Sequence, residues 1–389
     1  MEGDFIKINK WLRPLSFLYG IGVNIRNQLF ELNILKSRSF ATPVISVGNI
    51  TVGGTGKTPH VEYLIRLLSK EIKVAVLSRG YKRKTHGYVL ADEQSTMRDI
   101  GDEPYQMKRK FPQIEVAVDT KRCRGIEHII NDDATKDTDV ILLDDAYQHR
   151  YVKPGINILL VDYHRLIIYD ELLPSGRLRE PVDSKKRADI VIITKCPDTL
   201  NPIDYRVLTK AMKLYAYQSL YFTSLKYGAP YPLFDSKAAV PDLRYTDVLL
   251  LTGIASPEHM IADMEPMVRS LTPLIFPDHH AFSHRDIEKI NDAFDAMEND
   301  SKAVITTEKD AARLRGIDGL SEDVKVNIFV LPVEVRFMLD GEEQFNEKII
   351  SYVRKNSRNS ILVKRKDDHK TKNSNNLRNG TRTISFRNH

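Results

Sequence analysis

A doubly wound α/β fold with a parallel sheet, joined to a second, smaller α/β domain, is the architecture that this 389-residue sequence predicts. Two observations lead to it. Short continuous apolar runs alternate with helix-like stretches between residues 43 and 195, and a second series of apolar runs begins at residue 248. Continuous apolar runs are typical of parallel strands, because helices cover both faces of a parallel sheet. Their alternation with helices indicates crossover connections between the strands.

The first series of apolar runs defines a core domain that we expect over residues 41–217. Its strands are expected at 44–47, 74–77, 114–118, 140–143, 156–161 and 190–194. A second α/β domain is expected over 218–355, with strands at 248–251, 303–306 and 327–331. Residues 215–245, rich in Tyr and Pro, are interpreted as the connection between the two domains. In such sheets ligands bind at the carboxyl ends of the strands.

The composition is that of an ordinary globular protein with a sizeable core, since 42% of residues are hydrophobic and 28% are charged. Cys123 and Cys196 are the two cysteines, so no disulfide framework is expected and a reducing compartment fits. No apolar stretch approaches the roughly 20 residues of a membrane-spanning helix. The N-terminus also lacks the apolar segment and cleavage site of a signal peptide.

The net charge of +6 belongs to the C-terminal end. Residues 358–389 hold nine Lys and Arg against two Asp, so the remainder of the chain is slightly negative. We expect residues 356–389 to form a basic, disordered tail, because they are rich in Asn, Lys and Arg and show little apolar periodicity. Such a tail could contact an anionic membrane or nucleic acid, but a solvated tail is favoured, and we expect the protein to have no nucleic-acid partner.

Residues 1–40 form a separate N-terminal segment with an unusual apolar content. Its apolar and basic residues suit an amphipathic helix that lies in a membrane interface. A helix whose apolar residues pack into the domain core would show the same pattern, so the sequence leaves both interpretations open. The apolar residues are Trp11, Leu12, Leu15, Phe17, Leu18, Ile21 and Ile25.

The glycine-rich stretch after the first strand predicts a nucleotide phosphate loop. It ends in Gly56-Lys57-Thr58 and opens a helix whose apolar residues recur at helical spacing. Strand, glycine-rich turn, Lys-Thr and helix is the layout of a P-loop, in which Lys57 reaches the terminal phosphates and the Thr58 hydroxyl ligates Mg²⁺. One departure is Thr51, which stands where the usual pattern has its first glycine. The predicted nucleotide-binding residues are Thr51, Val52, Gly53, Gly54, Thr55, Gly56, Lys57 and Thr58.

Two carboxylates, Asp144 and Asp145, directly follow the apolar run 140–143. Acidic residues at the carboxyl end of a buried strand are the usual Mg²⁺ ligands of a P-loop enzyme. A solvated strand end is the alternative, and the phosphate loop upstream favours the metal site.

Further polar clusters follow other predicted strands. Arg79, in Ser-Arg-Gly-Tyr, is a candidate phosphate contact. Asp102 and Glu103, in Gly-Asp-Glu-Pro, suit a base or metal ligand, although Asp102 is equally typical of a helix N-terminus. Residues 174–181 carry two guanidinium groups, and Asp278-His279-His280 follows a short apolar run. Each cluster alone is compatible with a structural role.

Taken together, these motifs resemble those of one enzyme family. The chain is similar to the tetraacyldisaccharide 4′-kinases, the lipid A 4′-kinases of Gram-negative bacteria. The displaced first glycine is a trait of that family, whereas Ala146 stands where the family usually has glycine. The tail from about residue 356 has no counterpart. The motifs that carry the resemblance, in order over residues 15–313, are LSFLYG, VGNITVGGTGKTP, SRGY, GDEP, DDAYQH, PSGRLREP, FPDHH and TTEKDA.

The resemblance implies a P-loop NTPase-like kinase whose two domains are joined by a two-stranded hinge. It would use ATP and Mg²⁺ to phosphorylate the 4′-hydroxyl of a tetraacylated glucosamine disaccharide 1-phosphate, giving lipid IVA. It implies a peripheral, monotopic enzyme on the cytoplasmic face of the bacterial inner membrane. We expect this lipid A precursor and the membrane surface as partners, and a monomer.

The resemblance also implies roles for individual residues. Asp102 and His279 would form a catalytic pair from opposite domains, one activating the sugar hydroxyl with help from the other. Lys57 would act on the transferring phosphate, and Thr58, Asp144 and Asp145 would hold the metal. Further active-site candidates are Arg79, Glu103, Arg122, Gln148, Arg179 and Glu180.

Two other functions remain open from the residues alone. One is a nucleotide-dependent switch, because residues 192–198, which end in Thr194-Lys195-Cys196-Pro197-Asp198, faintly resemble the base-reading motif of GTPases. The other is a kinase that acts on a small soluble molecule.

Overall fold

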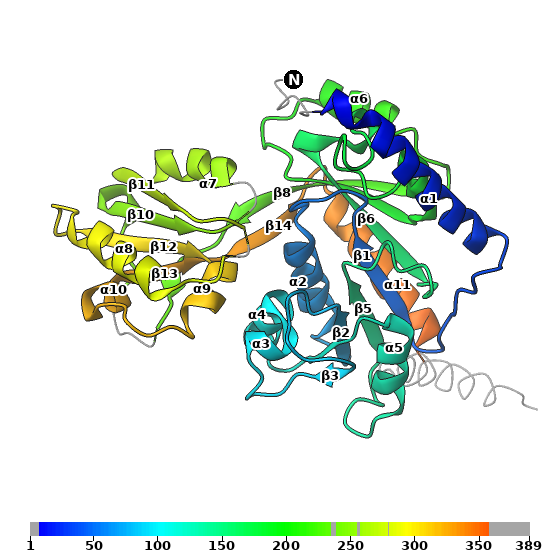
Figure 1. Cartoon of the computed structure of the whole chain (residues 1–389), viewed down its shortest axis with the longest axis horizontal. Helices are drawn as coiled ribbons and strands as arrows, with labels where there is room; N and C mark the ends of the chain where they lie inside the picture. Colours follow the sequence, from blue (N-terminus) through cyan, green and yellow to red (C-terminus); the bar gives the residue numbers. More distant parts are fainter. Residues whose placement is uncertain (1–7, 235–238, 255–256, 279, 358–389) are drawn as a thin grey trace, which may run out of the picture.

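The computed structural model describes residues 8–234, 239–254, 257–278 and 280–357. Two sheets organise these residues (Figure 1). The larger sheet has nine strands in the order β14-β8-β7-β6-β1-β5-β2-β4-β3, and the smaller has five in the order β11-β10-β12-β13-β9. The predicted fold class, a doubly wound parallel sheet with a second α/β part, is confirmed. The predicted tail lies outside the described residues from residue 358 onward.

The large sheet is parallel except at its two edges. Its parallel strands include all six that the first apolar series predicts. A two-residue strand, β3, lies antiparallel at one edge, and β14 lies antiparallel to β8 at the other. Its strands are β1 (Val44–Gly48), β2 (Val74–Ser78), β3 (Val89–Leu90), β4 (Glu115–Val118), β5 (Val140–Asp144), β6 (Ile156–Asp162), β7 (Ile190–Thr194), β8 (Ser219–Tyr227) and β14 (Val333–Phe337).

Helices cover both faces of this sheet because its strands are apolar on both faces. In β1, Ile45 and Val47 pack in the core that contains α2 and α11, while Val44 packs in the core that contains α5. Alternate residues of a strand point to opposite faces, so a continuous apolar run requires a helix layer on each side. The helices are α2 (Lys57–Leu68), α3 (Met97–Ile100), α4 (Asp102–Lys110), α5 (Arg122–Asn131), α6 (Pro202–Met212) and α11 (Gly341–Asn356).

The smaller part repeats this design on a lesser scale. Its central strand β10 lies between β11 and β12, parallel to both. The strands are β9 (Tyr231–Pro232), β10 (Asp247–Thr252), β11 (Ser270–Ile275), β12 (Lys302–Thr307) and β13 (Ile328–Leu331). The helices are α7 (Pro257–Met264), α8 (His284–Asp295), α9 (Glu308–Leu314) and α10 (Glu322–Asn327).

Short 3₁₀ turns occur in both parts of the molecule, at Lys10–Leu12, Tyr163–Arg165, Ile167–Tyr169, Val182–Arg187, Leu243–Tyr245 and Glu265–Met267.

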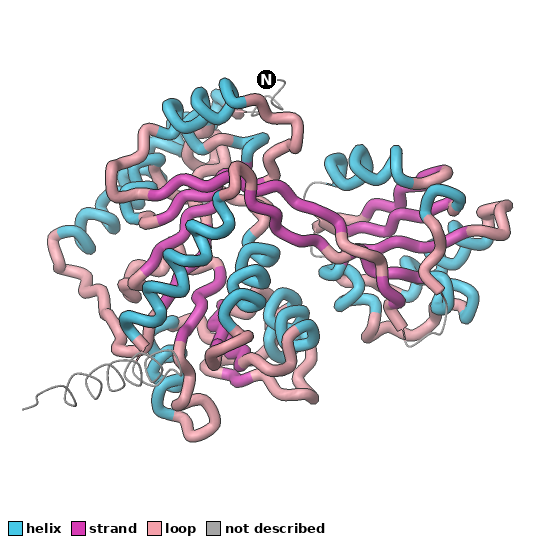
Figure 2. Tube along the Cα trace, turned by 180° about the vertical axis from the view of Figure 1, so that it is seen from behind, coloured by secondary structure: helices cyan, strands magenta, loops and turns pink. Residues whose placement is uncertain are grey.

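The strands β8 and β14 join the two parts. They pair in antiparallel register and run from the edge of the large sheet into the smaller part (Figure 2). After β14 the chain returns to the large sheet, where Phe345, Ile349 and Val353 of α11 are buried in its core. The sequence-based range 218–355 therefore assigns α11 to the wrong part. The apolar spacing of α11 predicts a helix, but it carries no information about which sheet that helix covers.

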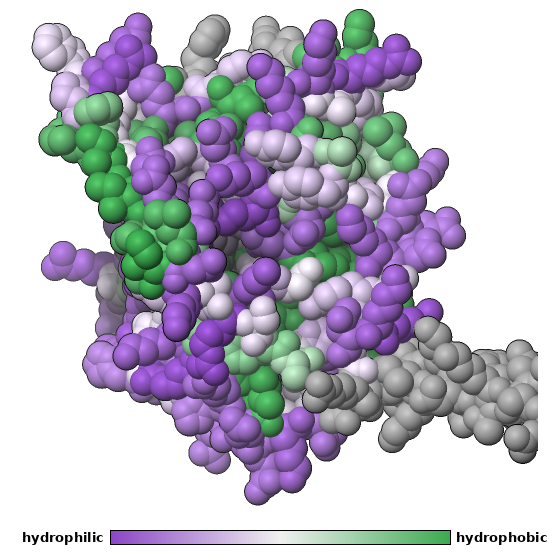
Figure 3. Space-filling model, turned by 90° about the vertical axis from the view of Figure 1, so that its right-hand side faces the viewer, coloured by the Kyte–Doolittle hydropathy of each residue, from purple (hydrophilic) through white to green (hydrophobic). Residues whose placement is uncertain are grey.

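The helix α1 (Arg13–Glu31) lies on the outside of the large part, and most of its large apolar side chains are in solvent. Its buried residues are mostly small or polar: Ser16, Gly20, Asn27 and Phe30. In contrast, Phe17 is 70% exposed and Leu18 is 63% exposed, and Trp11 just before the helix is 93% exposed. Figure 3 shows apolar side chains gathered in a band on this side of the molecule. Within the described residues, no helix has the length and apolarity to cross a membrane.

Candidate active site

The phosphate loop connects β1 to α2, and its turn begins after Thr51, the position at which the usual pattern has its first glycine. Thr51 is buried and still extended, and it bridges Leu178 of a neighbouring segment. The turn proper follows at Gly53 and Gly56, whose φ angles of 118° and 78° are in the left-handed region that glycine adopts readily. The extended pairing of Thr51 explains why the loop needs no glycine there.

One hydrogen bond within this loop and two from other segments fix its shape. The side-chain amide of Asn49 donates to Thr55 Oγ1 (2.9 Å), and Thr194 Oγ1 donates to the Thr55 carbonyl (3.0 Å). The Val52 N–H donates to the Arg177 carbonyl (2.8 Å). The loop is therefore held in shape from the end of β7 and from the 174–181 segment, as a preorganised phosphate cradle requires.

His60, in the first turn of α2, ties the loop to the strand β8. Its Nδ1 donates to the Gly56 carbonyl (2.7 Å) and its Nε2 accepts from Thr223 Oγ1 (3.1 Å). Burial lowers the pKa of His60 to about 4, so the ring is neutral. Sequence reasoning missed this residue, because a histidine on a helix gives no sign of the distant strand that it contacts.

The acidic pair lies at the carboxyl end of β5, beside the loop. Asp144 is buried and accepts from Ser78 Oγ through Oδ2 (3.1 Å). Burial, and then repulsion by Asp145, raises the pKa of Asp144. Asp145 has a φ of 46°, and its oxygens lie 3.6 Å from Lys57 Nζ and 3.6 Å from Arg179 Nη1. The predicted phosphate lysine and the two acidic metal-ligand candidates thus occupy one corner of the fold.

This corner has the ligands that Mg²⁺ requires. The Oδ1 atoms of Asp144 and Asp145 are buried and have no hydrogen-bond partner among the described residues. Mg²⁺ is usually held by one or two carboxylates, with substrate phosphates and water completing its shell. Within the described residues, no group of three or more His, Cys, Asp or Glu is arranged to hold a metal. The donor set therefore fits a cation that the protein and a nucleotide hold together.

A cleft of about 710 Å³ opens beside the phosphate loop, between the two parts of the molecule. The large part contributes residues 54–58 and Glu103, the hinge contributes 224–227, and the smaller part contributes Asp278 and Lys309. The cleft is large enough for a nucleotide, because small-molecule sites commonly measure roughly 300–1,000 Å³.

Glu103 is a cleft residue with a strongly shifted pKa. Burial, and then repulsion by Asp144, raises its pKa to about 7, although Lys309 and Lys57 oppose the shift. A carboxyl group with such a pKa in a cleft is a candidate acid–base group.

Asp102 is the first residue of α4, and it forms an ion pair with a residue of the smaller part. Its Oδ2 accepts from Arg313 Nη2 (2.7 Å). The predicted partner, His279, lies outside the described residues. Its neighbour Asp278 has Oδ1 3.4 Å from Lys309 Nζ. Sequence reasoning missed Arg313, which follows the TTEKDA motif at the end of a short helix.

None of the three predicted arginines, Arg79, Arg122 and Arg179, is among the residues that line the cleft. Arg122 is buried behind the acidic pair, where Nη1 donates to the Asp119 carbonyl (2.6 Å) and Nη2 to the Asp144 carbonyl (3.3 Å). Burial lowers the pKa of Arg122 to about 10. Arg122 thus supports the strand end that presents the two carboxylates. Arg79 is exposed at the surface.

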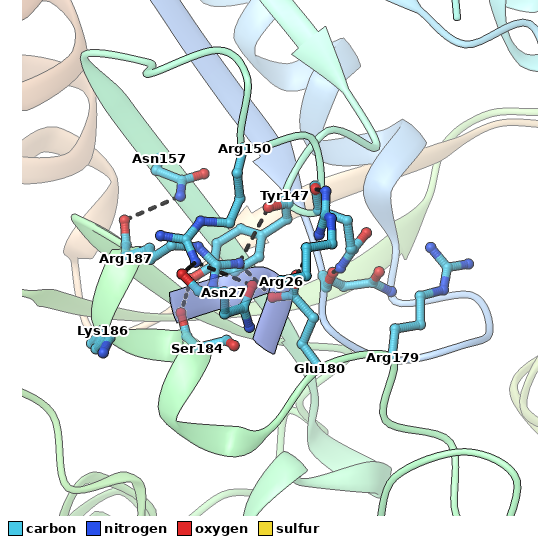
Figure 4. A network of polar contacts seen from close by, with 12 residues as sticks. Arg26, Asn27, Tyr147, Arg150, Asn157, Arg179, Glu180, Ser184, Lys186 and Arg187 are labelled. Atoms are coloured by element: carbon cyan, nitrogen blue, oxygen red, sulfur yellow. Dashed lines mark hydrogen bonds and ion pairs between the residues drawn. The ribbon is translucent and has the colours of Figure 1, made fainter. Parts of the chain in front are cut away.

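Three further predicted residues connect the corner that holds Lys57, Asp144 and Asp145 with α1, and Figure 4 shows two of them, Arg179 and Glu180. Gln148 donates to the Asn49 carbonyl (2.5 Å), and its own carbonyl accepts from Arg26 Nη2 of α1 (2.9 Å). The Arg179 carbonyl accepts from the Tyr19 hydroxyl of α1 (2.8 Å). Glu180 is buried against Arg187 Nη2 (2.5 Å), with Arg26 Nη1 4.0 Å away. Glu180 is therefore an internal anchor for α1.

Comparison with known proteins places these features in one family. The sequence matches the family described as tetraacyldisaccharide-1-P 4′-kinase over residues 8–354. It is 57% identical to the tetraacyldisaccharide 4′-kinase of Phocaeicola vulgatus over 364 residues, which cover 92% of this chain and 99% of that one. The enzyme of the same name from Bacteroides thetaiotaomicron is 51% identical over 381 residues, covering 95% and 100% of the two chains. Among solved structures, the "apo" form of LpxK from Aquifex aeolicus in complex with ATP matches with a TM-score of 0.67 and 28% identity, over 88% of this chain and 98% of that one.

Proposed function

This chain belongs to the tetraacyldisaccharide-1-P 4′-kinase family, and from that membership we propose how its residues carry out the reaction. The enzyme transfers the γ-phosphate of ATP to the 4′-hydroxyl of a tetraacylated glucosamine disaccharide 1-phosphate, which gives lipid IVA. The observation that carries the proposal is the phosphate loop, which faces both the acidic pair and the cleft between the two parts. The family resemblance expected from the sequence is confirmed.

The phosphate loop and the acidic pair hold the nucleotide. Backbone N–H groups of the loop and the N-terminus of α2 bind the phosphates. Lys57 neutralises charge on the transferring group, which matters because phosphoryl transfer depends mainly on positioning and electrostatic stabilisation. Thr58, Asp144 and Asp145 would hold Mg²⁺, which supplies charge neutralisation at the phosphate oxygens when it is bound.

The sugar hydroxyl must lose a proton as it attacks, so a base within hydrogen-bond reach is required. We assign this role to Asp102, with His279 of the smaller part as its partner. Glu103, adjacent to Asp102 and titrating near neutral pH, balances the charge of the cleft as the nucleotide enters. Because the two partners come from different parts, closure of the cleft assembles the base and excludes water.

The helix α1 is the proposed membrane contact. An acylated substrate is held in the bilayer by about 0.8 kcal/mol for each buried CH₂ group, so the enzyme must work at the membrane surface. Apart from Phe30, the buried residues of α1 are small or polar, and large apolar side chains such as Phe17 and Leu18 point outward. That pattern is the reverse of a helix packed on a core and fits a peripheral enzyme at the inner membrane. We place it on the cytoplasmic face, where ATP is available, and expect it to be a monomer.

The GTPase-like segment 194–198 does not favour a switch protein. Its Asp198 pairs with Lys226, and Lys195 Nζ lies 2.8 Å from Asp162 Oδ2. Both side chains that would read a guanine base therefore have partners within the protein.

Transfer of labelled phosphate from ATP to a purified tetraacylated disaccharide 1-phosphate in mixed micelles tests the proposal. We expect transfer to the lipid, little transfer to the deacylated disaccharide, and poor use of GTP. Equal transfer to the deacylated sugar would favour a soluble-substrate kinase. Nucleotide hydrolysis without transfer to either sugar would favour a switch protein.

A further inference from the structure

The seam between the two parts is formed by α4 and α9, and Arg313 lies within it. α4 begins at Asp102 in the large part, and α9 carries Arg313 at its end in the smaller part. Arg313 is buried, and its Nη2 donates to Asp102 Oδ2 at 2.7 Å. The proposed base is therefore held by a guanidinium group that belongs to the other side of the cleft.

The smaller part fixes Arg313 through a buried carboxylate. Asp310 Oδ1 accepts from Arg313 Nη1 (2.9 Å), and Asp310 Oδ2 accepts from the Gly253 N–H (2.8 Å) and from Thr307 Oγ1 (2.7 Å). Gly253 follows β10 and Thr307 ends β12. Asp310, which holds Arg313, is therefore itself held by the carboxyl ends of two strands of the smaller sheet. A residue held by such a rigid support can position another group with the precision that catalysis needs.

We propose that Arg313 is a positioning residue for phosphoryl transfer, which fixes the Asp102 carboxylate when the two parts are closed. The inference rests on the proposed role of Asp102 as the base and goes beyond it, because it names what orients that base. A guanidinium group presents its donors in a fixed plane, so a bond to one carboxylate oxygen restricts how the carboxylate can rotate.

A second contact keeps the seam closed independently of Arg313. Lys110, at the end of α4, lies 2.6 Å from Glu62 of α2 and also pairs with Glu308 at the start of α9. These contacts lie at the opposite ends of the two helices from the Asp102–Arg313 pair. Replacing Arg313 therefore removes this contact with Asp102 while leaving a bridge between the parts.

The test compares turnover and ATP affinity in four variants: Arg313→Met, Arg313→Lys, Asp102→Asn and the double Asp102→Asn/Arg313→Met. We expect Arg313→Met to lower kcat by roughly 100-fold, the size of effect that misplacing a catalytic group has. KM for ATP should stay within about twofold, because the phosphate loop is untouched. Arg313→Lys should restore part of kcat, since it keeps the charge but loses the planar fork. The double variant should be no slower than Asp102→Asn alone.

Arg315→Met is the matched control, because Arg315 lies two residues further on, is exposed and donates to the Leu233 carbonyl. It should behave like the wild type. Near-wild-type kcat in Arg313→Met, or losses that multiply in the double variant, would overturn the inference. If Arg313→Met does not fold, a kcat for Arg313→Lys equal to that of wild type would overturn it. A fully active Asp102→Asn would instead overturn the proposed base itself, so the two failures are distinguishable.

Discussion

Replacing His60 by Gln should make the stability of the enzyme less sensitive to acid. His60 is buried, its Nδ1 donates to the phosphate loop and its Nε2 accepts from β8. Glutamine is similar in length and can keep one of these bonds, but it cannot take up a proton. The variant therefore loses a roughly constant amount of stability, about 1 kcal/mol for one hydrogen bond, at every pH.

The pH-dependent part follows from the pKa of His60, which burial lowers from 6.5 to about 4. The unfolded chain binds the proton more readily, so the stability contributed by neutral His60 is fully present above pH 6.5. It is lost as the pH falls toward 4. The shift corresponds to about 3 kcal/mol in total, of which about 2 kcal/mol is lost between pH 7.5 and pH 5.

Urea unfolding followed by circular dichroism, at pH 7.5, 6 and 5, measures this contribution. The stability difference between wild type and His60→Gln should shrink by about 2 kcal/mol, or reverse, on going to pH 5. Taking the difference cancels other titrating groups such as Asp286, whose pKa is lowered mainly by hydrogen bonds from Ser283. His86→Gln, at an exposed position, is the control and should follow the wild type. Parallel loss of stability in wild type and His60→Gln would refute the reasoning.

Four further predictions concern activity. Lys57→Ala should nearly abolish transfer without changing the thermal melt, because water cannot replace a fixed charge at the phosphates; near-normal turnover would remove Lys57 from the site. Asp144→Ala and Asp145→Ala should weaken Mg²⁺-dependent activity, severely in at least one case, and an unchanged Mg²⁺ titration in both would make the pair structural. Asp102→Ala and His279→Ala should lose rate non-additively while ATP affinity persists, whereas losses that multiply would show independent roles. Replacing Phe17 and Leu18 by Ser should move the protein from membrane to soluble fractions and raise KM for the lipid, with ATP handling unchanged; retained membrane binding would argue against α1 as the contact.

The large sheet and the phosphate loop were predictable because their signals are local. Six continuous apolar runs became six parallel strands, and the Gly-Lys-Thr sequence became the first turn of α2. The acidic pair was placed correctly at the end of β5 because a strand end can be read from a single segment. Strands β3 and β9, with two residues each, leave no comparable trace in the sequence.

The contacts that span the fold were not predictable. Arg313 meets Asp102 across 211 positions of the chain, and His60 meets Thr223 across 163. Nothing in either local sequence indicates the partner, because each pair depends on how two separately formed elements pack. Arg122 was named only from the family resemblance, and its contact with the backbone carbonyl of Asp144 could likewise not be predicted from its local sequence.

The two faces of α1 determine which perturbation of this helix is informative. Removing residues 1–26 would take away the exposed apolar side chains of α1. It would also remove Tyr19 and Arg26, which donate hydrogen bonds to the carbonyls of Arg179 and Gln148. Arg179 Nη1 in turn lies 3.6 Å from Asp145 Oδ2. The deletion would therefore disturb the acidic pair beside the phosphate loop as well as the membrane contact. Substituting the outward residues Phe17 and Leu18 changes only the exposed face. A loss of lipid use with intact ATP handling in that variant would separate membrane attachment from chemistry, which the deletion cannot do.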